Sequence, residues 1–378
     1  MQKESSKLQT MENREAASQT NTDGRRPVYI ASFPTPADDT YYFWLYYEAL
    51  AKLGYELANT RGVTLTEEWL EKNAGKIDII HFHWPAYIYS KKNFKDFYHS
   101  LIHFVRLLRK AKSLKYTIAW TVHNIFPHER NNLVLEYAAR FCLARLADVL
   151  FVHFKEAKAT VGKRFFRFKD IHEIPHGNFF SVFQNNCTRE EARTRLNIPV
   201  DSFVYLVFGP VRPYKGIEEA LDAFERTATA KDVLLVVGNC SDEKTGKWLT
   251  DKAEADPRIV PHLRFVPKDE VEFFFNASDV VLLPYKKIFT SGNLFLAFTF
   301  GKPVICPDMG IISEVVDSNV GIMYKPSQDS SALAEAMRGI KNLDYDKACA
   351  AAFGKARSFT WEEAAIRSEQ AFRQCSRK

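Results

Sequence analysis

Two basic side chains, three residues apart, stand directly ahead of a segment with helical periodicity. The apolar run Phe203–Phe208 is typical of a buried strand and ends at Gly209, after which Arg212 and Lys215 precede the helical segment that starts at Ile217. Two fixed positive charges beside the free N–H groups of a helix N-terminus suit the binding of a diphosphate. A solvent-exposed basic turn would explain this segment equally well.

A second segment offers another place for an anion. The run Val280–Leu283 is typical of a strand, Tyr285 follows it, and Ser291, Gly292 and Asn293 open a further helical segment. Small side chains at the start of a helix leave backbone N–H groups free to bind an anion. The two segments together predict one ligand that carries phosphate.

Histidines gather after the strands predicted in the first half of the chain. His81 and His83 share one face of a strand, because side chains alternate along a strand with a period of two, and His123 ends the next strand. His176 follows a later strand. A structural role and a role at a ligand site stay open for each of them.

Two neighbouring carboxylates, Asp38 and Asp39, follow the first predicted strand and precede a helix rich in aromatic residues. Asp39 or Thr40 can cap that helix by accepting its first N–H groups, which would explain the pair without any chemistry. A carboxylate in a strand-end loop can also face a cleft and take the proton of a reacting hydroxyl. Both interpretations stay open, and Glu129, in the loop after His123, is a further candidate base.

The elements that must position these residues alternate along the chain. From Pro27 onward, short β-rich runs are followed by longer helical segments, the pattern of βα units on a parallel sheet. Two such series predict an α/β protein with two Rossmann-like domains, whose ligands bind at the carboxyl ends of the strands. The predicted parts are a disordered tail (1–26), an N-terminal domain (27–180), a linker (181–200), a C-terminal domain (201–350) and a helix that packs back on the first domain (351–378).

No dinucleotide fingerprint of the form GxGxxG follows the first strand, and no phosphate-binding GxxxxGK[ST] is present. Redox and P-loop functions therefore lose their main support. The predicted strands are Val28–Phe33, Ile77–His83, Tyr116–His123, Val149–His153, Ile171–Pro175, Phe203–Phe208, Val233–Val237, Leu263–Val266, Val280–Leu283, Val304–Cys306 and Gly321–Tyr324.

The net charge of the 378-residue chain is only +6, and the positive charge is concentrated in one segment. Lys91 to Lys115 carries eight Lys or Arg against one Asp, and its apolar residues recur at helical spacing. A basic face confined to one helix does not favour a nucleic-acid protein. The apolar side of this amphipathic helix can cover a sheet while its basic side meets anionic lipid head groups.

Composition excludes several other classes. With 46% hydrophobic residues the chain can bury large cores, so general disorder is excluded. Six scattered cysteines form no CxxC pair, which favours neither a zinc site nor a disulfide framework and indicates a reducing compartment. No uncharged apolar run of 18 residues and no signal-like segment occurs, so we expect a cytoplasmic protein that does not span a membrane.

The second half of the chain resembles the glycosyltransferases of the GT-B fold, and especially the group 1 superfamily that includes family 4. The resemblance extends roughly from Phe203 to Lys325, and its pieces occur in order along the chain. The matching pieces are Phe208-Gly209, Arg212, Lys215-Gly216, Val236-Val237-Gly238, the run from Asp279 to Tyr285, Ser291-Gly292, the run from Gly301 to Ile305, and Glu314 followed by Gly321.

The resemblance implies two Rossmann-like domains that face each other across a cleft, with a nucleoside-diphosphate sugar bound mainly by the second. Arg212 and Lys215 would hold the diphosphate, and backbone near Val266 would meet the base. Similar proteins also place a histidine at the position of His123, facing the donor sugar. The remaining donor-site residues implied are Gly209, Tyr285, Ser291, Gly292 and Asn293.

One departure from the family pattern concerns the reaction. Retaining members carry two Glu eight positions apart, and alignment on Gly301 puts Ile288 and Leu296 at those places. A retaining mechanism is therefore not assumed, and direct inverting displacement is favoured. Asp38 or Asp39 would be the base and His123 would position the sugar.

These inferences predict a metal-independent hexosyltransferase without a cofactor, acting in polysaccharide biosynthesis. No DxD motif stands at a strand end, and cationic side chains with helix N-termini can stabilise a leaving diphosphate. The acceptor would be a lipid-linked or membrane-proximal glycan, reached from the inner face of the membrane as a peripheral protein. The alternatives are a nucleotide-sugar epimerase of the same fold and a non-catalytic subunit that binds the donor.

Overall fold

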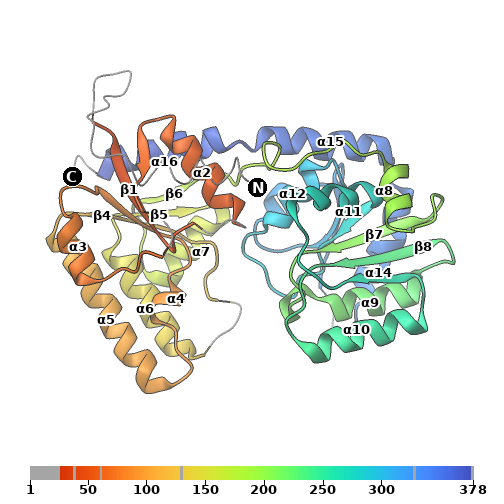
Figure 1. Cartoon of the computed structure of the whole chain (residues 1–378), viewed down its shortest axis with the longest axis horizontal. Helices are drawn as coiled ribbons and strands as arrows, with labels where there is room; N and C mark the ends of the chain where they lie inside the picture. Colours follow the sequence, from red (N-terminus) through yellow and green to blue (C-terminus); the bar gives the residue numbers. More distant parts are fainter. Residues whose placement is uncertain (1–25, 37–39, 60–61, 128–130, 327–328, 376–378) are drawn as a thin grey trace.

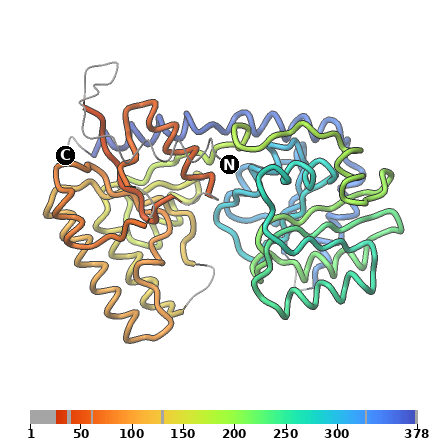
Figure 2. Tube along the Cα trace, viewed as in Figure 1, coloured from red at the N-terminus to blue at the C-terminus, as the bar shows by residue number. Residues whose placement is uncertain are grey.

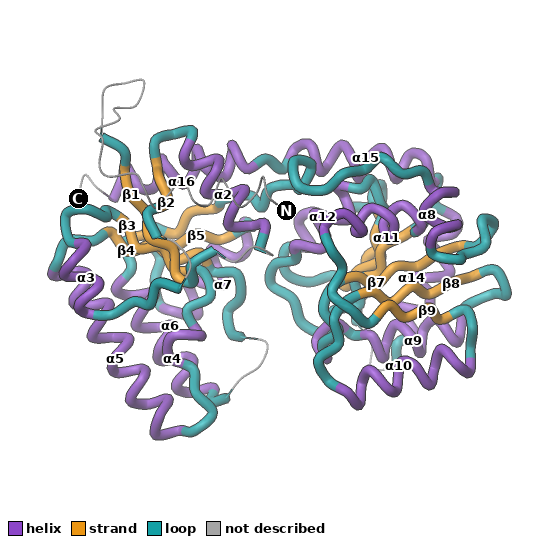
Figure 3. Tube along the Cα trace, in the orientation of Figure 1, coloured by secondary structure: helices purple, strands orange, loops and turns teal. Residues whose placement is uncertain are grey.

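The computed structural model describes residues 26–375 apart from 37–39, 60–61, 128–130 and 327–328. Over these residues the chain forms two six-stranded sheets in which all neighbouring strands run parallel. In Figure 3 each sheet lies between helices on both of its faces. Parallel sheets covered in this way have strands that are apolar throughout, which is why the strands could be recognised as continuous β-rich runs.

The first sheet has the order β2-β1-β3-β4-β5-β6. Helices α2 (Tyr41–Ala51) and α16 (Trp361–Cys375) cover one face of this sheet, whereas α5 (Phe94–Ser113) and α6 (Leu133–Leu146) cover the other (Figure 1). Its elements are β1 (Val28–Phe33), α2 (Tyr41–Ala51), β2 (Tyr55–Leu57), α3 (Glu67–Asn73), β3 (Ile79–Phe82), α4 (Ala86–Tyr89), α5 (Phe94–Ser113), β4 (Thr117–Thr121), α6 (Leu133–Leu146), β5 (Val149–Val152), α7 (Lys155–Phe165) and β6 (Ile171–Glu173).

The second sheet has the order β12-β11-β10-β7-β8-β9. The chain passes from the first sheet to the second through a linker that contains α8 (Arg189–Arg195). Helix α8 begins with a capping box at Thr188 and packs on α11 (Val271–Ala277) of the second domain. The elements of the second domain are β7 (Phe203–Phe208), α9 (Ile217–Thr227), β8 (Asp232–Val237), α10 (Glu243–Ala255), β9 (Ile259–His262), α11 (Val271–Ala277), β10 (Val280–Leu282), α12 (Gly292–Thr299), β11 (Val304–Pro307), α13 (Ile312–Val315), β12 (Gly321–Tyr324) and α14 (Ser331–Gly339).

One strand prediction was wrong, and one strand was missed. The prediction of Leu263–Val266 missed strand β9, which is Ile259–His262 and pairs with β8. Pro261 argued against a strand there, but β9 is the edge of its sheet, where a residue without an N–H is tolerated. Strand β2 was not predicted, because its three residues are too short for a recognisable pattern.

The chain ends with two helices that run along both domains, α15 (Tyr345–Ser358) and α16 (Trp361–Cys375). Helix α15 packs on α12 of the second domain, whereas α16 packs on α2, β5 and β6 of the first, as the blue tube in Figure 2 shows. At the crossing between them, Nε1 of Trp361 donates to the carbonyl of Asn178 at 2.6 Å. A Cβ at Gly177 would lie 2.3 Å from the Trp361 ring, so this crossing requires glycine.

Candidate functional site

The carboxyl ends of the two sheets meet each other. The hydroxyl of Thr290 donates to the carbonyl of His123 at 3.0 Å, and the Phe154 and Phe289 rings meet edge to face at 4.9 Å. Between these ends lies a cavity of about 420 Å³. It is lined by Asn124, Ile125, Phe126, Pro127, Tyr214, Lys287, Ile288 and Phe289, so both domains contribute to its wall.

A carboxylate of the second domain caps a helix of the first. Both oxygens of Glu314 accept backbone N–H groups at the start of α7, from Lys155 at 2.9 Å and from Glu156 at 2.8 Å. The N-cap residue of α7 is Phe154, whose side chain has no polar atom to accept these N–H groups. The start of α7 in the first domain is therefore held by a side chain of the second domain.

Three predicted donor residues converge at the end of β7. A Cβ at Gly209 would lie 2.9 Å from Nζ of Lys215 and 3.0 Å from Nδ2 of Asn293. Both nitrogens donate to the carbonyl of Phe208, at 3.2 Å and 2.6 Å respectively. The two segments that the sequence singled out for anion binding thus form one site.

Gly216 brings these two segments together. Its φ is +71°, and a Cβ there would lie 1.8 Å from the carbonyl oxygen of Pro284. Nearby, the hydroxyls of Tyr285 and Ser291 are 2.9 Å apart, and Ser291 also accepts the N–H of Leu294 as the N-cap of α12. The polar groups of Tyr285 and Ser291 therefore fix the start of α12 rather than point into open space.

Burial controls the charge of this site. Lys215 is only 6% exposed, and burial lowers its pKa from the ordinary value to about 8. Arg212 is exposed, just before the short turn that carries Lys215. The site thus holds one buried cationic side chain close to Asn293 at the start of α12, with the exposed Arg212 three residues earlier in the chain, an arrangement that can bind a diphosphate.

A chain of hydrogen-bonded histidines crosses the carboxyl edge of the first sheet. Nδ1 of His83 lies 3.0 Å from Nε2 of His123, and Nδ1 of His123 lies 3.3 Å from Nε2 of His153. Tyr47 joins this chain to His81, since its hydroxyl lies 2.9 Å from Nε2 of His83 and 3.1 Å from Nδ1 of His81. All four histidines are buried.

The acceptor at one end of this chain determines every tautomer in it. Nδ1 of His153 lies 3.1 Å from the carbonyl oxygen of Ile174, which can only accept, so His153 carries its proton on Nδ1. With neutral rings, Nδ1 of His123 must then donate to Nε2 of His153, and Nδ1 of His83 must donate to Nε2 of His123. The hydroxyl of Tyr47 donates to Nε2 of His83. At the far end Nδ1 of His81 donates to Tyr47.

Burial keeps these rings neutral. It lowers the pKa of His81 to about 3 and that of His153 to about 4, and it lowers the pKa values of His83 and His123 well below the ordinary value. Both ring nitrogens of His123 are engaged inside the chain, and the Trp84 ring stacks on it at 4.3 Å. His123 lies where the two domains meet, since its carbonyl accepts the hydroxyl of Thr290, but its ring nitrogens point to other histidines.

The remaining predicted residues have different outcomes. Asp38, Asp39 and Glu129, the candidate bases, lie outside the described residues. Thr40 is the N-cap of α2, but its side chain makes no capping hydrogen bond. Val266 lies in the loop after β9, partly buried against the core.

The two positions at which retaining family members carry Glu are occupied by apolar residues here, Ile288 and Leu296. Ile288 lines the cavity between the domains, and Leu296 is buried in α12. Among the described residues that line this cavity there is no Asp or Glu. A carboxylate acting in it must therefore come from outside that lining.

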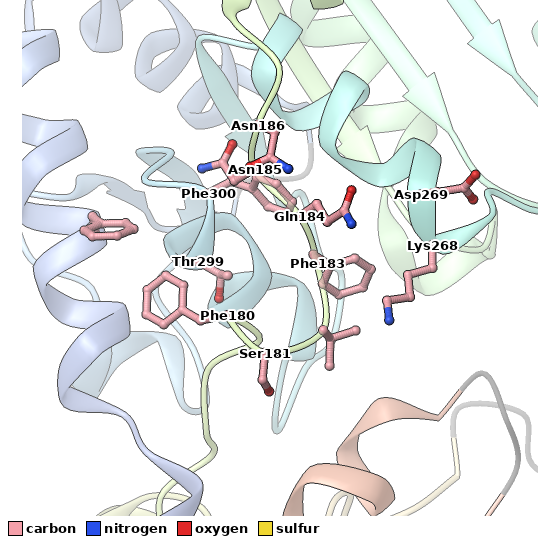
Figure 4. A pocket seen from close by; sticks show the side chains of 12 residues that line it. Phe180, Ser181, Phe183, Gln184, Asn185, Asn186, Lys268, Asp269, Thr299 and Phe300 are labelled. Carbon is pink, nitrogen blue, oxygen red and sulfur yellow. The ribbon is translucent and has the colours of Figure 1, made fainter. Parts of the chain in front are cut away.

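A larger groove, of about 850 Å³, runs under the linker and contains none of the predicted site residues. Figure 4 shows Phe183 and Gln184 on the linker, Thr299 and Phe300 at the end of α12, and Lys268 and Asp269 ahead of α11. The rings of Phe180 and Phe353 meet at 5.0 Å across its wall. Arg212, Lys215 and the residues that open α12 do not line this groove, so we do not assign the donor site to it.

Tyr47 and His153 were not predicted as site residues from the sequence, although both belong to the histidine chain. A signal for His153 was present, because His83, His123 and His153 each follow a strand of the same parallel sheet. Carboxyl ends of neighbouring parallel strands meet at one edge, so these side chains had to be close. Nothing comparable marked Tyr47, which comes from the middle of α2.

Within the described part of the chain, no group of His, Cys, Asp or Glu is arranged to hold a metal ion. In the same residues no helix is long and apolar enough to cross a membrane.

Comparison with known proteins gives three results for the sequence and the fold. Residues 188–356 match the family described as glycosyl transferases group 1. A GDP-mannose:glycolipid 4-beta-D-mannosyltransferase of Xanthomonas campestris pv. campestris is 28% identical over 262 residues, covering 68% of this chain and 70% of that protein. Anabaena Alr3699/HepE, solved in complex with UDP, has a TM-score of 0.72 at 14% identity, covering 93% of this chain and 100% of that one.

A further solved structure has the same fold. Sucrose-phosphate synthase from Thermosynechococcus elongatus has a TM-score of 0.69 at 18% identity, covering 93% of this chain and 99% of that one. The predicted fold class, two Rossmann-like domains facing each other across a cleft, is confirmed.

Proposed function

Residues 188–356 belong to the group 1 glycosyltransferases, and we propose that this chain transfers a sugar from a nucleoside-diphosphate sugar to a glycan that is lipid-linked or close to a membrane. The observation that carries this proposal is the convergence of Gly209, Lys215 and Asn293 at the end of β7, next to the start of α12. That arrangement offers an ammonium group and free helix N–H groups to a diphosphate.

The donor is supported by chemistry and by relatives. Lys215 and Arg212 would neutralise the diphosphate as it leaves, a task that charged side chains and helix N-termini can perform without a metal ion. Anabaena Alr3699/HepE is described with UDP, and the Xanthomonas enzyme is named for GDP-mannose. A direct binding test is therefore needed to identify the nucleobase and the sugar of the donor.

The proposed reaction is a direct displacement. The acceptor oxygen bonds to the anomeric carbon while the bond from that carbon to the diphosphate breaks, and the acceptor proton passes to a carboxylate. Apolar Ile288 and Leu296 at the positions of the family's Glu pair favour a base from the first domain, for which Asp38 and Asp39 stay the candidates. The Xanthomonas relative is named for a β-linked product, which an α-linked donor yields by inversion.

The acceptor side is supported by the surface of α5. Its apolar face, with Phe97, Leu101 and Phe104, is buried, whereas Lys95 and Arg106 are exposed. The rings of Phe94 and Tyr98, near the first turn of α5, are 61% and 48% exposed. Basic side chains beside exposed aromatic rings suit an anionic membrane surface, where a lipid-linked acceptor such as that of the named glycolipid transferase would be held.

The donor is tested by a thermal-unfolding panel of UDP-, GDP- and ADP-sugars. A ligand present at 100 times its dissociation constant stabilises the folded state by about 2.7 kcal/mol. We expect one nucleotide series to raise the midpoint of unfolding, and Lys215→Ala and Arg212→Ala to reduce that shift. No stabilisation by any nucleotide sugar would refute the proposed function.

Turnover distinguishes transfer from the alternatives. With the donor identified, NMR of the product formed on membrane extracts gives its anomeric configuration. We expect an inverted product. A retained anomer would refute the displacement but leave the transferase, an epimerised free donor would indicate the epimerase, and donor binding without turnover would indicate a non-catalytic subunit.

A further inference from the structure

His176 lies at the junction of the two domains, directly beside the start of α12. Its ring is 5% exposed and stacks on the Phe295 ring of α12, with an interplanar angle of 1° and centroids 4.5 Å apart. The Trp361 and Tyr42 rings meet it at 5.2 Å and 5.4 Å. The imidazole is thus held by aromatic neighbours from both domains and cannot reorient freely.

The proton on this ring is located by a backbone carbonyl. Nδ1 of His176 lies 2.8 Å from the carbonyl oxygen of Gly177, which can only accept, so Nδ1 carries the hydrogen. Burial lowers the pKa of His176 to about 3, with a smaller contribution from His153, and the ring is neutral near pH 7. Nε2 therefore presents a lone pair, and within the described residues it has no hydrogen-bond partner.

This lone pair faces the start of α12. A Cβ built on Gly292 would have Nε2 of His176 at 3.9 Å and no other atom within 4 Å, so the space beside Gly292 is open. The N–H groups of Gly292 and Asn293 belong to the first turn and precede the intrahelical ladder. An acceptor on a largely buried ring and free backbone donors thus border the same space beside Gly292.

We propose that Nε2 of His176 accepts a hydrogen bond from a hydroxyl group of the transferred sugar, whose phosphate lies against the start of α12. This inference rests on the proposed function and adds a residue that selects the sugar. An unprotonated nitrogen repels a phosphate oxygen but pairs with a hydroxyl, whereas the helix N–H groups pair with the phosphate. Nε2 of His176 therefore binds the sugar, and the N–H groups at the start of α12 bind its phosphate.

The inference predicts selectivity among donors. A donor that lacks the hydroxyl at this position leaves Nε2 buried without a partner, which costs affinity. A bare nucleoside diphosphate does not reach the nitrogen and is unaffected by it.

The test is calorimetric binding of UDP, GDP, UDP-glucose and GDP-mannose to the full chain and to two variants. His176→Phe keeps an aromatic ring on Phe295 but removes the acceptor, whereas His176→Gln retains an oxygen near the position of Nε2. For the nucleotide sugar that the wild type binds, we expect His176→Phe to weaken affinity about 3- to 10-fold, the range of one neutral hydrogen bond. We expect His176→Gln to recover most of that loss, and the matching nucleoside diphosphate to bind all three chains equally.

Deoxy donors sharpen the test, because a structural role would not produce selectivity. In the wild type one monodeoxy sugar should lose about 3- to 10-fold in affinity, and in His176→Phe that same analogue should bind as well as the parent donor. Equal binding of the nucleotide sugar by wild type and His176→Phe would refute the inference alone. Absence of any nucleotide binding by the wild type would refute the proposed function and the inference with it.

Discussion

Lys215 is a buried ammonium group in the proposed donor site, where its charge would attract a diphosphate. Its Nζ is close to Gly209 and donates to the carbonyl of Phe208, and no carboxylate is among the causes that shift its pKa. Burial penalises the charged form, which lowers the pKa to about 8. A bound diphosphate supplies the missing negative charge, so binding and protonation of this side chain are linked.

This linkage predicts a pH-dependent affinity. The charged form of Lys215 is present below pH 8 and is lost as the pH rises through that value. Calorimetric affinity for the matching nucleoside diphosphate should therefore fall between pH 7.5 and pH 9.5, in a range where the phosphates, with a second pKa of about 6, no longer titrate.

A matched variant isolates Lys215 from other groups. Lys215→Arg stays protonated over this range and should show little pH dependence, whereas Lys215→Met should bind weakly at every pH. An affinity of the wild type that is constant from pH 7 to pH 9.5 would contradict the role of Lys215.

A second prediction at the level of a single residue concerns the substitution Gly216→Ala. The Cβ of Gly216→Ala would lie 1.8 Å from the oxygen of Pro284, at a φ of +71° that alanine disfavours. The two segments must move apart, so both the free energy of unfolding and nucleotide affinity should fall, the former by more than about 1 kcal/mol.

The control for this substitution is Gly246→Ala in α10. A Cβ there meets only Sγ of Cys240, at 3.8 Å, and alanine favours helix by about 1 kcal/mol over glycine. Denaturant unfolding should show Gly246→Ala at or above wild-type stability. Wild-type stability and affinity in Gly216→Ala would show that the close approach to Pro284 is not needed.

Helix α5 is the element that combines a buried and a charged face. Asn93 caps it through the N–H groups of Lys95 and Asp96, and its last turn carries Lys110 and Lys112, which favours this helix at both ends. The amphipathic helix predicted from the sequence is therefore present, and its inner face covers the sheet. Its outer face leaves the basic residues exposed.

Charge reversal on this outer face should weaken membrane binding. We expect wild-type protein to sediment preferentially with vesicles that contain anionic lipid, and the reversed variant to bind less and with a weaker salt dependence, because each basic residue near the surface contributes about 1 kcal/mol. The residues to change to Glu are Lys92, Lys95, Arg106 and Arg109.

A control with the same change in net charge separates this surface from overall charge. Four exposed lysines of α7 and α10 serve for it, and their reversal should leave vesicle binding much closer to wild type: Lys158, Lys163, Lys244 and Lys247. Equal binding of wild-type protein to neutral and anionic vesicles would refute the membrane proposal.

At the scale of the whole molecule, the histidines couple folding to pH. His81, His83, His123, His153 and His176 are buried and neutral in the folded chain, with pKa values lowered by burial. In the unfolded chain they become protonated as the pH falls below about 6.5. The unfolded state then binds more protons than the folded one, so stability decreases with falling pH.

Stability should therefore be nearly independent of these groups above pH 7 and should fall from about pH 6.5 toward the folded pKa values, which are about 3 for His81 and about 4 for His153. Each histidine contributes at most about 1.4 kcal/mol per pH unit in that window. Denaturant unfolding between pH 7.5 and pH 5 measures the slope.

The exposed His103 of α5 supplies the comparison. His103→Gln should leave the slope unchanged, whereas His81→Gln should reduce it by about one proton. A stability that does not change between pH 7 and pH 5 would contradict the neutral histidine chain.

The sequence alone determined the class of the molecule. The alternation of apolar runs with helical segments predicts two parallel sheets, because strands buried on both faces must be apolar throughout. The ordered pieces from Phe208 to Glu314 identified the group 1 glycosyltransferases, and that recognition is confirmed. Arg212 and Lys215 could be selected because they stand at a strand end before a helix, a local feature that needs no tertiary information.

Only the tertiary structure decided which of these residues meet. Gly216 and Pro284 are distant in sequence, and their contact brings together the two segments that we propose to bind the donor. His83, His123 and His153 form one chain because their strands are neighbours, and strand order depends on pairing between segments rather than on local pattern.

Strand β9 at the sheet edge and the hydrogen-bond acceptor Nε2 of His176 could also not be predicted from the sequence alone. Pro261 disfavours a strand locally, and only its place at the edge of the sheet makes it acceptable. The free nitrogen of His176 results from a carbonyl beside it, a Phe295 ring from the other domain and the tryptophan of the returning C-terminal helix. Burial and hydrogen-bond partners come from residues distant in the chain, so the protonation and direction of a side chain follow from the folded structure and not from its own segment.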